Sequence, residues 1–149
     1  EIIKSFKEYA IYLSKVGFSC YSEYIDFLSL QIILGFDDTY IDTPQDYNDD
    51  LAKILYGYIN GSNYELTGNL YEREYYSVFV DYCNEKLTFT DLMNYVSNRW
   101  YISSIGFYWF DSHKKDLDVY TGYWCYVASA VIRVKEDYGK ITDEYSYII

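Results

Sequence analysis

The residue best suited to proton transfer is the single histidine, His113, which is surrounded in sequence by Asp111, Asp116 and Asp118. A histidine oriented by a carboxylate can act as a general base. A nucleophilic triad would also require a serine or cysteine on a strained turn, and the chain contains no G-x-S-x-G sequence. Because two lysines directly follow the histidine, we favour a structural hydrogen-bonding role for His113. A hydrolase that uses His113 is the alternative.

Metal-binding patterns in the sequence are incomplete. Asp46, Asn48 and Asp50 match the first three ligand positions of a calcium loop. Leu51 stands where that loop requires glycine and Gly57 where it requires a bidentate glutamate, so the pattern fails. A zinc site would need more histidines or paired cysteines, and no glycine-rich phosphate-binding loop occurs. We therefore expect no metal ion, no cofactor and no catalytic residue, and we expect that the protein is not an enzyme.

The cysteines indicate a reducing compartment. Cys20, Cys83 and Cys125 are odd in number and have no C-x-x-C spacing, which favours reduced, buried thiols. No stretch approaches the run of about 18 apolar residues that a membrane span needs, and no signal peptide is visible. We expect a cytoplasmic protein that does not bind a membrane.

Charge narrows the class of partner. The chain carries 12 basic and 23 acidic residues, a formal net charge of −11. Such a field repels nucleic-acid phosphates and attracts basic proteins, although simple solubility would also explain it. Between Lys15 and Lys53 there is no lysine or arginine. That stretch contains eight carboxylates, namely Glu23, Asp26, Asp37, Asp38, Asp42, Asp46, Asp49 and Asp50.

The elements that must position these residues are helical. The apolar spacing recurs at three and four residues almost everywhere, as in the first stripe of Ile2, Phe6, Tyr9, Leu13 and Val16. Further helical stripes lie in residues 22–34, 51–60, 71–83, 88–100 and 119–136. We predict an all-α fold, a single-domain bundle of about six helices over residues 1–149. An aromatic-rich loop, residues 105–118, precedes the last long helix.

Several local features sharpen this prediction. Residues 22–34 are apolar nearly all round, which is typical of a helix at the centre of a domain. Gly35 follows as a C-terminal cap, and Thr88 with Asp91 forms a capping box for the next-to-last helix. On the last helix the residues predicted to face inward are Tyr120, Trp124, Val127, Val131 and Val134.

The segment before and at the start of that last helix carries a distinctive pattern. It reads Asp111-Ser112-His113-Lys114-Lys115-Asp116, then Tyr120, then Gly122-Tyr123-Trp124-Cys125-Tyr126. This pattern resembles the C-terminal signature of PoNi-type immunity proteins, and residues 28–59 are also similar to that family. The family tends to carry a glutamate where Val127 stands here. The resemblance implies a protein that neutralises a PoNe-type DNase toxin delivered between competing bacteria. Family members often have a further N-terminal helical segment, so the resemblance leaves open that residues 1–149 are a fragment without it.

From the resemblance and the charge pattern we expect an immunity protein whose partner is a basic nuclease toxin domain. We expect a structural role for the signature residues Ser112, His113, Lys114, Asp116, Tyr120, Gly122, Tyr123 and Trp124. We expect the toxin to be bound by an acidic face that contains Asp37, Asp38, Tyr40, Asp42, Asp46, Tyr47, Asp49 and Asp50. The alternative is a broader acidic DNA-mimic inhibitor, or a protein-interaction module, without a single cognate toxin. Binding at a toxin exosite and the oligomeric state stay open.

Overall fold

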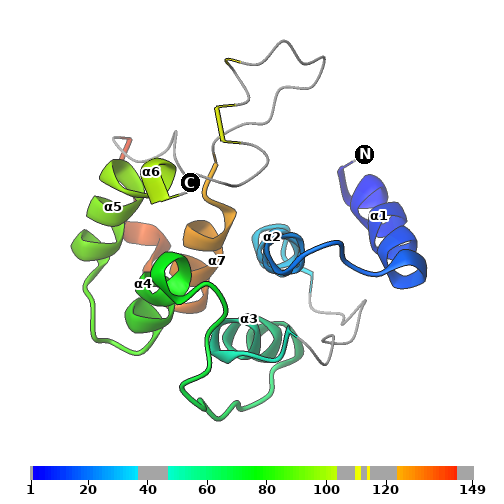
Figure 1. The fold of residues 1–149 in the computed structure, drawn as a ribbon, viewed down its shortest axis with the longest axis horizontal. Helices are drawn as coiled ribbons and strands as arrows, with labels where there is room; N and C mark the ends of the chain where they lie inside the picture. The colour runs from blue at the N-terminus through cyan, green and yellow to red at the C-terminus, as the bar shows by residue number, and fades with distance from the viewer. Residues whose placement is uncertain (1, 37–46, 104–109, 112–113, 115–123, 144–149) are drawn as a thin grey trace.

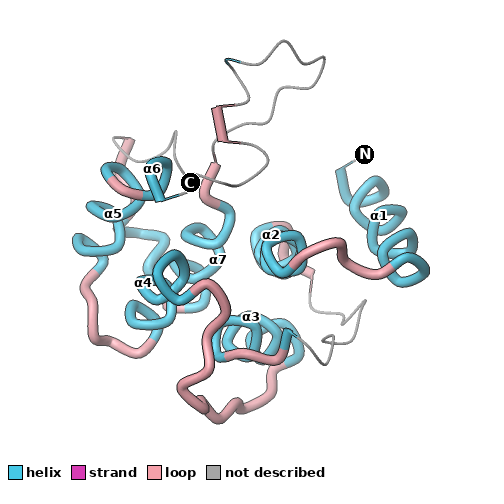
Figure 2. The backbone as a smooth tube through the Cα atoms, viewed as in Figure 1, coloured by secondary structure: helices cyan, strands magenta, loops and turns pink. Residues whose placement is uncertain are grey.

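A computed structural model of the chain describes residues 2–36, 47–103, 110–111, 114 and 124–143. These residues form α1 (Ile2–Val16), α2 (Tyr21–Ile33), α3 (Asp50–Asn60), α4 (Arg73–Cys83), α5 (Phe89–Asn98), α6 (Trp100–Ser103), α7 (Tyr126–Val134) and the 3₁₀ helix η3 (Asp137–Lys140). The described part contains no strand (Figure 2). The all-α prediction is confirmed. None of the helices within these ranges is long and apolar enough to cross a bilayer.

The last long helix, α7, is the hub of the fold. It packs against α2, α3 and α4, and α2 also packs along α3. Helix α4 in turn contacts α5, which continues into the short α6. Figure 1 shows α5 and α6 at one end of the molecule and α1 at the other, beyond α2. The acidic segment therefore connects α2 to α3 within the central group, and the signature segment connects α6 to the central helix α7.

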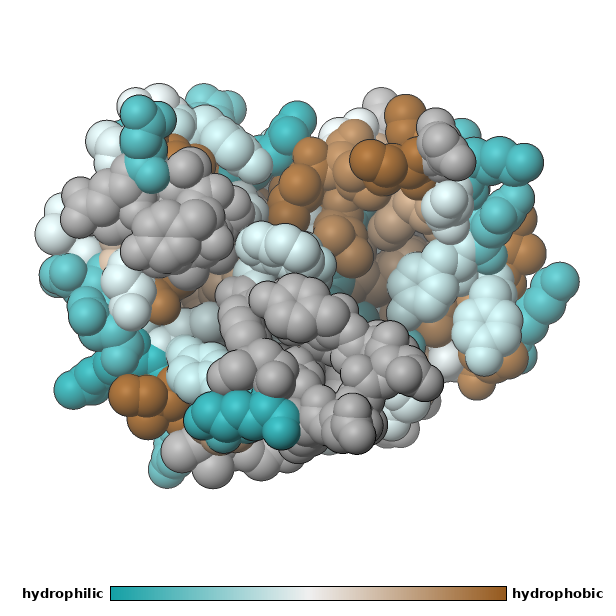
Figure 3. All heavy atoms as spheres, turned by 90° about the horizontal axis from the view of Figure 1, so that it is seen from above, coloured by the Kyte–Doolittle hydropathy of each residue, from teal (hydrophilic) through white to brown (hydrophobic). Residues whose placement is uncertain are grey.

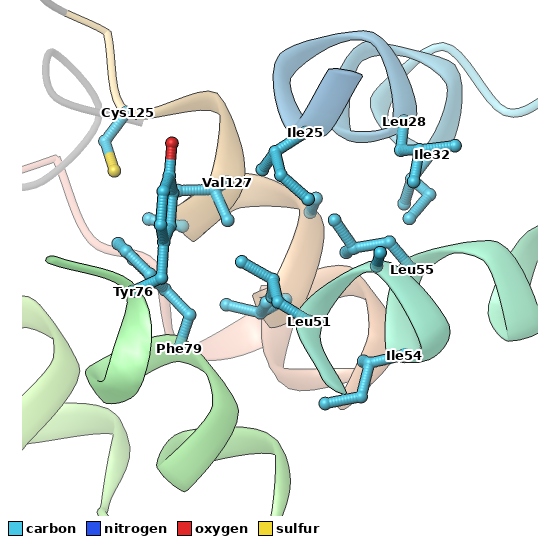
Figure 4. Close-up of a cluster of buried hydrophobic side chains, with 14 of the residues drawn as sticks. Ile25, Leu28, Ile32, Leu51, Ile54, Leu55, Tyr76, Phe79, Cys125 and Val127 are labelled. Carbon is cyan, nitrogen blue, oxygen red and sulfur yellow. The ribbon is translucent and has the colours of Figure 1, made fainter. Parts of the chain in front are cut away.

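The core lies where α2, α3, α4 and α7 meet. Figure 4 shows Ile25 of α2, Leu51 of α3, Phe79 of α4 and Val127 of α7 converging there, and none of them is more than 1% exposed. Helix α2 was predicted to be a buried centre because it is apolar nearly all round. It buries eight of its 13 residues, so that prediction is confirmed.

Helix ends also follow the sequence signals. Gly35 has φ +74°, its N–H donates to the Ile32 carbonyl at 3.0 Å, and the next N–H, of Phe36, donates to Gln31 at 3.1 Å. This is the paired hydrogen bonding that closes a helix on a left-handed residue. The capping box of Thr88 and Asp91 is present, with bonds in both directions. Both predicted caps are confirmed.

The last long helix begins later in the structure than predicted. Helix α7 begins at Tyr126, after Trp124 and Cys125, which lie outside the helix. The prediction that Trp124 faces inward is wrong, because its side chain is 52% exposed and Cys125 occupies the buried position beside it. Val127 and Val131 do face inward, and Tyr120 lies outside the described residues.

Helix α1 departs most from its predicted stripe. The buried residues are Phe6, Ala10 and Leu13, whereas Ile2 and Val16 are 70% and 58% exposed. Apolar side chains accordingly reach the surface over the α1 end of the molecule, at the right in Figure 3. The sequence stripe therefore mixes the face that α2 covers with a neighbouring face that remains exposed.

Candidate interaction surface

Asp49 is a buried carboxylate that accepts three hydrogen bonds from separate parts of the chain. It precedes α3, where an aspartate can accept the otherwise unpaired N–H groups of the first turn. The Ala52 N–H donates to Asp49 Oδ1 at 2.9 Å, and the Tyr71 N–H donates to Oδ2 at 2.9 Å. The Tyr21 hydroxyl donates to Oδ2 at 2.6 Å. Asp49 therefore joins α2, the start of α3 and the segment before α4 through one buried group.

Asp50 holds the loop that follows α3. The Thr67 N–H donates to Asp50 Oδ1 at 2.7 Å, and the Gly68 N–H donates to Oδ2 at 2.8 Å. The Thr67 hydroxyl adds a third bond at 3.1 Å, and the Asp50 N–H donates to the Asn69 carbonyl at 2.9 Å. A buried carboxylate is tolerated when its oxygens accept hydrogen bonds in this way. Asp50 thus fastens residues 67–69 against the first turn of α3.

These contacts correct one part of the predicted acidic face. Asp49 and Asp50 are only 2% and 5% exposed, and their oxygens accept hydrogen bonds from within the chain. They therefore offer a partner almost no surface. The sequence could not distinguish them from the other aspartates because burial depends on the loop from residue 61 to residue 72, which is distant in sequence.

The Tyr21 hydroxyl is held in place by its hydrogen bond to Asp49. Burial raises its pKa well above the ordinary value, and the negative charge of Asp49 raises it further. Tyr21 therefore stays a neutral donor throughout the range in which proteins are studied. The hydrogen bond from Tyr21 to Asp49 therefore links α2 to the start of α3 at every such pH.

Tyr47 lies at the edge of a cluster of tyrosine rings. It stacks on Tyr24, with ring centroids 5.8 Å apart, and meets Tyr21 edge to face at 5.7 Å. Tyr71 stacks on Tyr21 with ring centroids 5.1 Å apart and approaches Tyr47 at 6.2 Å. Tyr47 is half-buried, and Tyr71 is 48% exposed. We call Tyr47 and Tyr71 the tyrosine edge, the place where this aromatic cluster reaches the surface.

Tyr71 is a surface residue that the sequence did not identify. The spacing placed it on the buried stripe of the next helix, but α4 begins only at Arg73. The run of charged residues 72–74 was the available signal, because charges concentrate at exposed helix starts. Glu72 extends the tyrosine edge with a carboxylate, whose pKa is raised by partial burial.

The described part of the signature segment shows how its loop is attached. The Tyr101 hydroxyl at the end of α6 donates to Asp111, and Lys114 forms an ion pair with the same carboxylate at 3.0 Å. The Phe110 ring stacks on Tyr101 with centroids 4.7 Å apart. The structural role expected for Lys114 stays a prediction, which this ion pair supports. Trp124 instead presents an exposed ring beside Tyr126, at 6.5 Å between centroids.

The three cysteines are unpaired and shielded. Burial raises the pKa of the Cys83 thiol to about 12, and burial raises that of Cys125 well above its ordinary value. A thiol with a raised pKa is a poor nucleophile because the thiolate is the reactive form. The expectation of a buried, unbridged thiol is confirmed for Cys125, whereas Cys20 and Cys83 are free and half-buried. Among the described residues no cluster of three potential metal ligands occurs.

The remaining predicted site residues fall outside the described ranges. From the acidic face these are Asp37, Asp38, Tyr40, Asp42 and Asp46. From the signature they are Ser112, His113, Asp116, Tyr120, Gly122 and Tyr123. The structure therefore brings together Tyr47, Asp49 and Asp50 of the predicted acidic face, with Tyr71 as an addition.

Comparison with known proteins gives one family. The family model described as PoNe immunity proteins (PoNi), C-terminal, matches residues 47–147, a range that begins at the tyrosine edge and includes α3 to η3. No curated protein and no solved structure matches the chain.

Proposed function

The chain belongs to the family of PoNe immunity proteins (PoNi), and from this premise we propose that it neutralises a cognate nuclease toxin by binding and covering its DNA-binding cleft. The family match is the observation that carries this proposal. The inhibitor acts in the cytoplasm by binding alone, and it catalyses no reaction on the toxin.

The charge of the chain supports docking on a basic surface. A formal net charge of −11 complements the positive surface with which a nuclease binds DNA. The carboxylates proposed for the contact are Asp37, Asp38, Asp42 and Asp46, which run in sequence up to Tyr47. Complementary charge of this kind raises association rates toward about 10⁸ M⁻¹s⁻¹ at low salt. The acidic residues thus govern the encounter with the toxin.

The tyrosine edge supplies the anchor that charge alone does not. Interface residues that dominate binding energy are enriched in tyrosine and lie beside buried, rigid neighbours. Tyr71 is half exposed, and its ring stacks on the buried Tyr21. Because this stacking already orders the ring, Tyr71 loses little side-chain entropy when it binds a partner. Asp49 holds the backbone of Tyr71 in place. In this proposal the buried aspartates shape the surface, while Tyr40, Tyr47 and Tyr71 contact the toxin.

The first experiment tests the acidic residues against a control of equal charge. The triple variant Asp38→Asn, Asp42→Asn, Asp46→Asn removes three negative charges from the proposed contact. The control Glu85→Gln, Glu136→Gln, Asp143→Asn removes three negative charges from residues that follow α4 in the sequence, far from the acidic stretch. Association rates with the nuclease encoded beside this protein are measured at several salt concentrations, together with DNA cleavage.

We expect the first triple variant to associate about tenfold more slowly at low salt and to show a weaker salt dependence than the control. Equal slowing in both variants would mean that only net charge matters and would reject this docking face. Full inhibition of cleavage by a complex that still binds DNA would point to an exosite. Inhibition of unrelated nucleases would favour the broad DNA mimic.

A second experiment tests the aromatic anchor. Tyr71→Ala is compared with Tyr58→Ala, whose ring is similarly exposed at 42% but lies on α3. We expect the Tyr71 variant to dissociate from the nuclease about 10 to 100 times faster, as is typical for loss of an interface tyrosine. Equal dissociation rates for the two variants would remove Tyr71 from the contact.

A further inference from the structure

Helix α1 carries an exposed apolar seam with the spacing of a coiled coil. Ile2, Tyr9 and Val16 are seven residues apart, and Ser5 and Tyr12 lie between them, so the five residues occupy the a and d positions of two heptads. All five are exposed: Ile2 is 70%, Tyr12 58%, Val16 58% and Tyr9 37% exposed. Such a seam is typical of a helix that packs along another helix.

The seam lies beside the face by which α1 contacts α2, and only Tyr9, whose ring meets Phe27 edge to face at 6.3 Å, reaches α2 from it. That inner face consists of Phe6, Ala10 and Leu13. The Phe6 ring stacks on Phe27 and Phe36, with centroids 5.2 and 5.0 Å away. At about 100° per residue, the seam is turned by about 90° from this inner face. Within the described residues, α1 therefore has two apolar faces, and α2 covers one of them.

We propose that the seam pairs with the same seam of a second copy of this chain, with the two α1 helices antiparallel about a two-fold axis. A two-fold interface requires a surface that is complementary to itself. In this register Tyr9 packs beside Tyr12 of the other copy, and Val16 beside Ser5. Ser5 has a small side chain, so it leaves room for Val16 of the other copy.

The charges that flank the seam select the antiparallel arrangement. Glu8 and Lys15 both occupy the g position, directly before Tyr9 and Val16. In an antiparallel pair the g positions of the two helices face each other, so Glu8 meets Lys15 of the other copy twice. In a parallel pair each g position would face an e position, which here is Phe6 or Leu13, and neither charge would gain a partner.

The ion pair that Glu8 already forms with Lys4 competes only weakly with the proposed contact to Lys15 of the second copy. Glu8 lies 3.8 Å from Lys4, and their side chains are 66% and 81% exposed. Ion pairs this exposed contribute little to stability, so Glu8 can exchange Lys4 for Lys15 of the second copy at small cost. Tyr9 is already oriented, because its hydroxyl donates to Glu23 at 3.0 Å.

Salt separates this interface from the proposed toxin contact. Two copies that each carry a net charge of −11 repel one another, and salt screens that repulsion. The dimer therefore strengthens as salt is added, whereas docking on a basic nuclease weakens. The proposal does not depend on the proposed function, since α1 lies outside the family match at residues 47–147.

The test is sedimentation of the full chain over a wide concentration range, with a variant in the seam and a matched control. Tyr12→Glu places a charge in the seam, and Tyr58→Glu places one on an exposed tyrosine of α3. We expect a monomer–dimer equilibrium for the wild type and the control. Each copy in a two-fold dimer carries the substitution, so Tyr12→Glu places two glutamates in the interface. We therefore expect it to weaken the dimer about 100-fold. Circular dichroism checks that both variants stay folded.

Charge exchange tests the orientation. Glu8→Lys and Lys15→Glu each place like charges across the interface and are expected to weaken the dimer, whereas the double exchange restores it. A wild type that stays monomeric at all concentrations would overturn the proposal. So would a dimer that Tyr12→Glu and Tyr58→Glu weaken equally, or one that the double exchange fails to restore. A monomer whose affinity for the nuclease falls with Tyr12→Glu would assign the seam to that partner instead.

Discussion

Helices α1 and α2 are neighbours in the chain and both are rich in apolar residues, but they are used in opposite ways. Helix α2 buries eight of its 13 residues, and α1 buries three of its 15. Helix α2 packs along α3 and α7, whereas α1 meets the rest of the molecule through one narrow aromatic face. A similar apolar content therefore supports a core helix in one case and a surface helix in the other.

The difference is explained by how charge is distributed around each helix. Helix α1 carries Lys4, Lys7, Glu8 and Lys15, which divide its apolar residues into separate faces. Helix α2 carries only Glu23 and Asp26, both in its first half. A helix without a charged face can be surrounded by other helices, whereas each charge needs access to water or a partner. The position of charges thus predicts burial better than the number of apolar residues does.

The largest expected effect comes from truncating the core helix. Phe27 is 1% exposed and contacts the rings of Phe6 and Phe18. We expect Phe27→Ala to lower the free energy of unfolding by about 3–5 kcal/mol, because it leaves a cavity. The matched control is Ile11→Ala on α1, which is 55% exposed and should change stability by less than about 0.5 kcal/mol. Urea denaturation measures both, and similar losses would contradict the contrast between the helices.

The next effect tests the polar tie between α2 and α3. Asp49→Ala removes the acceptor for the Tyr21 hydroxyl and for the N–H groups of Ala52 and Tyr71. We expect a loss of about 3 kcal/mol, because buried donors lose their partner. Asp91→Ala removes a carboxylate acceptor from the exposed start of α5 and should cost much less than Asp49→Ala. If the two variants lost the same stability, burial of Asp49 would not matter.

Much of the fold could be predicted because its helices carry local signals. Periodic apolar residues, the glycine after α2 and the capping box of α5 are all read from residues close in sequence. The start of α7 was placed too early because Trp124 matches the apolar period of that helix. Its ring nevertheless lies outside the helix and is exposed, an outcome that depends on tertiary packing.

The interaction surface was harder to predict for the same reason. Charge identified the acidic stretch, but the burial of Asp49 and Asp50 depends on the loop from residue 61 to residue 72 and, for Asp49, also on Tyr21 of α2. Tyr71 reaches the surface because α4 begins two residues after it, a boundary that periodicity alone does not define. Contacts between distant segments thus decided which members of one acidic run are structural.

A smaller effect concerns the acidic residue within α2. Asp26 is half-buried, with Glu23 on the same helix and Tyr76 and Cys125 nearby. Burial, and to a lesser extent Glu23, raise the pKa of Asp26 from 3.8 to about 7. The folded state therefore binds the proton more tightly than the unfolded state, so stability falls as pH rises from about 4 to about 7.

Replacing the Asp26 carboxyl tests whether its protonation makes stability depend on pH. We expect Asp26→Asn to be more stable than the wild type above pH 7, by about 2 kcal/mol, and to lose this advantage near pH 4. Denaturation curves at several pH values measure the difference. Glu65→Gln, in the loop after α3, is the control, since its side chain is exposed and the variant should follow the wild-type profile. An Asp26→Asn curve parallel to the wild type would show that Asp26 is already ionised at low pH.

The smallest effect lies on the outer face of α1 and depends on concentration. Tyr12→Ser should change the free energy of unfolding of dilute protein by less than about 0.5 kcal/mol, because the ring is 58% exposed. Association stabilises the folded state by mass action, so the wild-type Tm should rise with protein concentration and that of the variant should not. Calorimetry at low and high concentration measures this. A large loss in dilute protein would mean instead that the seam is covered within the same chain, and α1 would then resemble α2 after all.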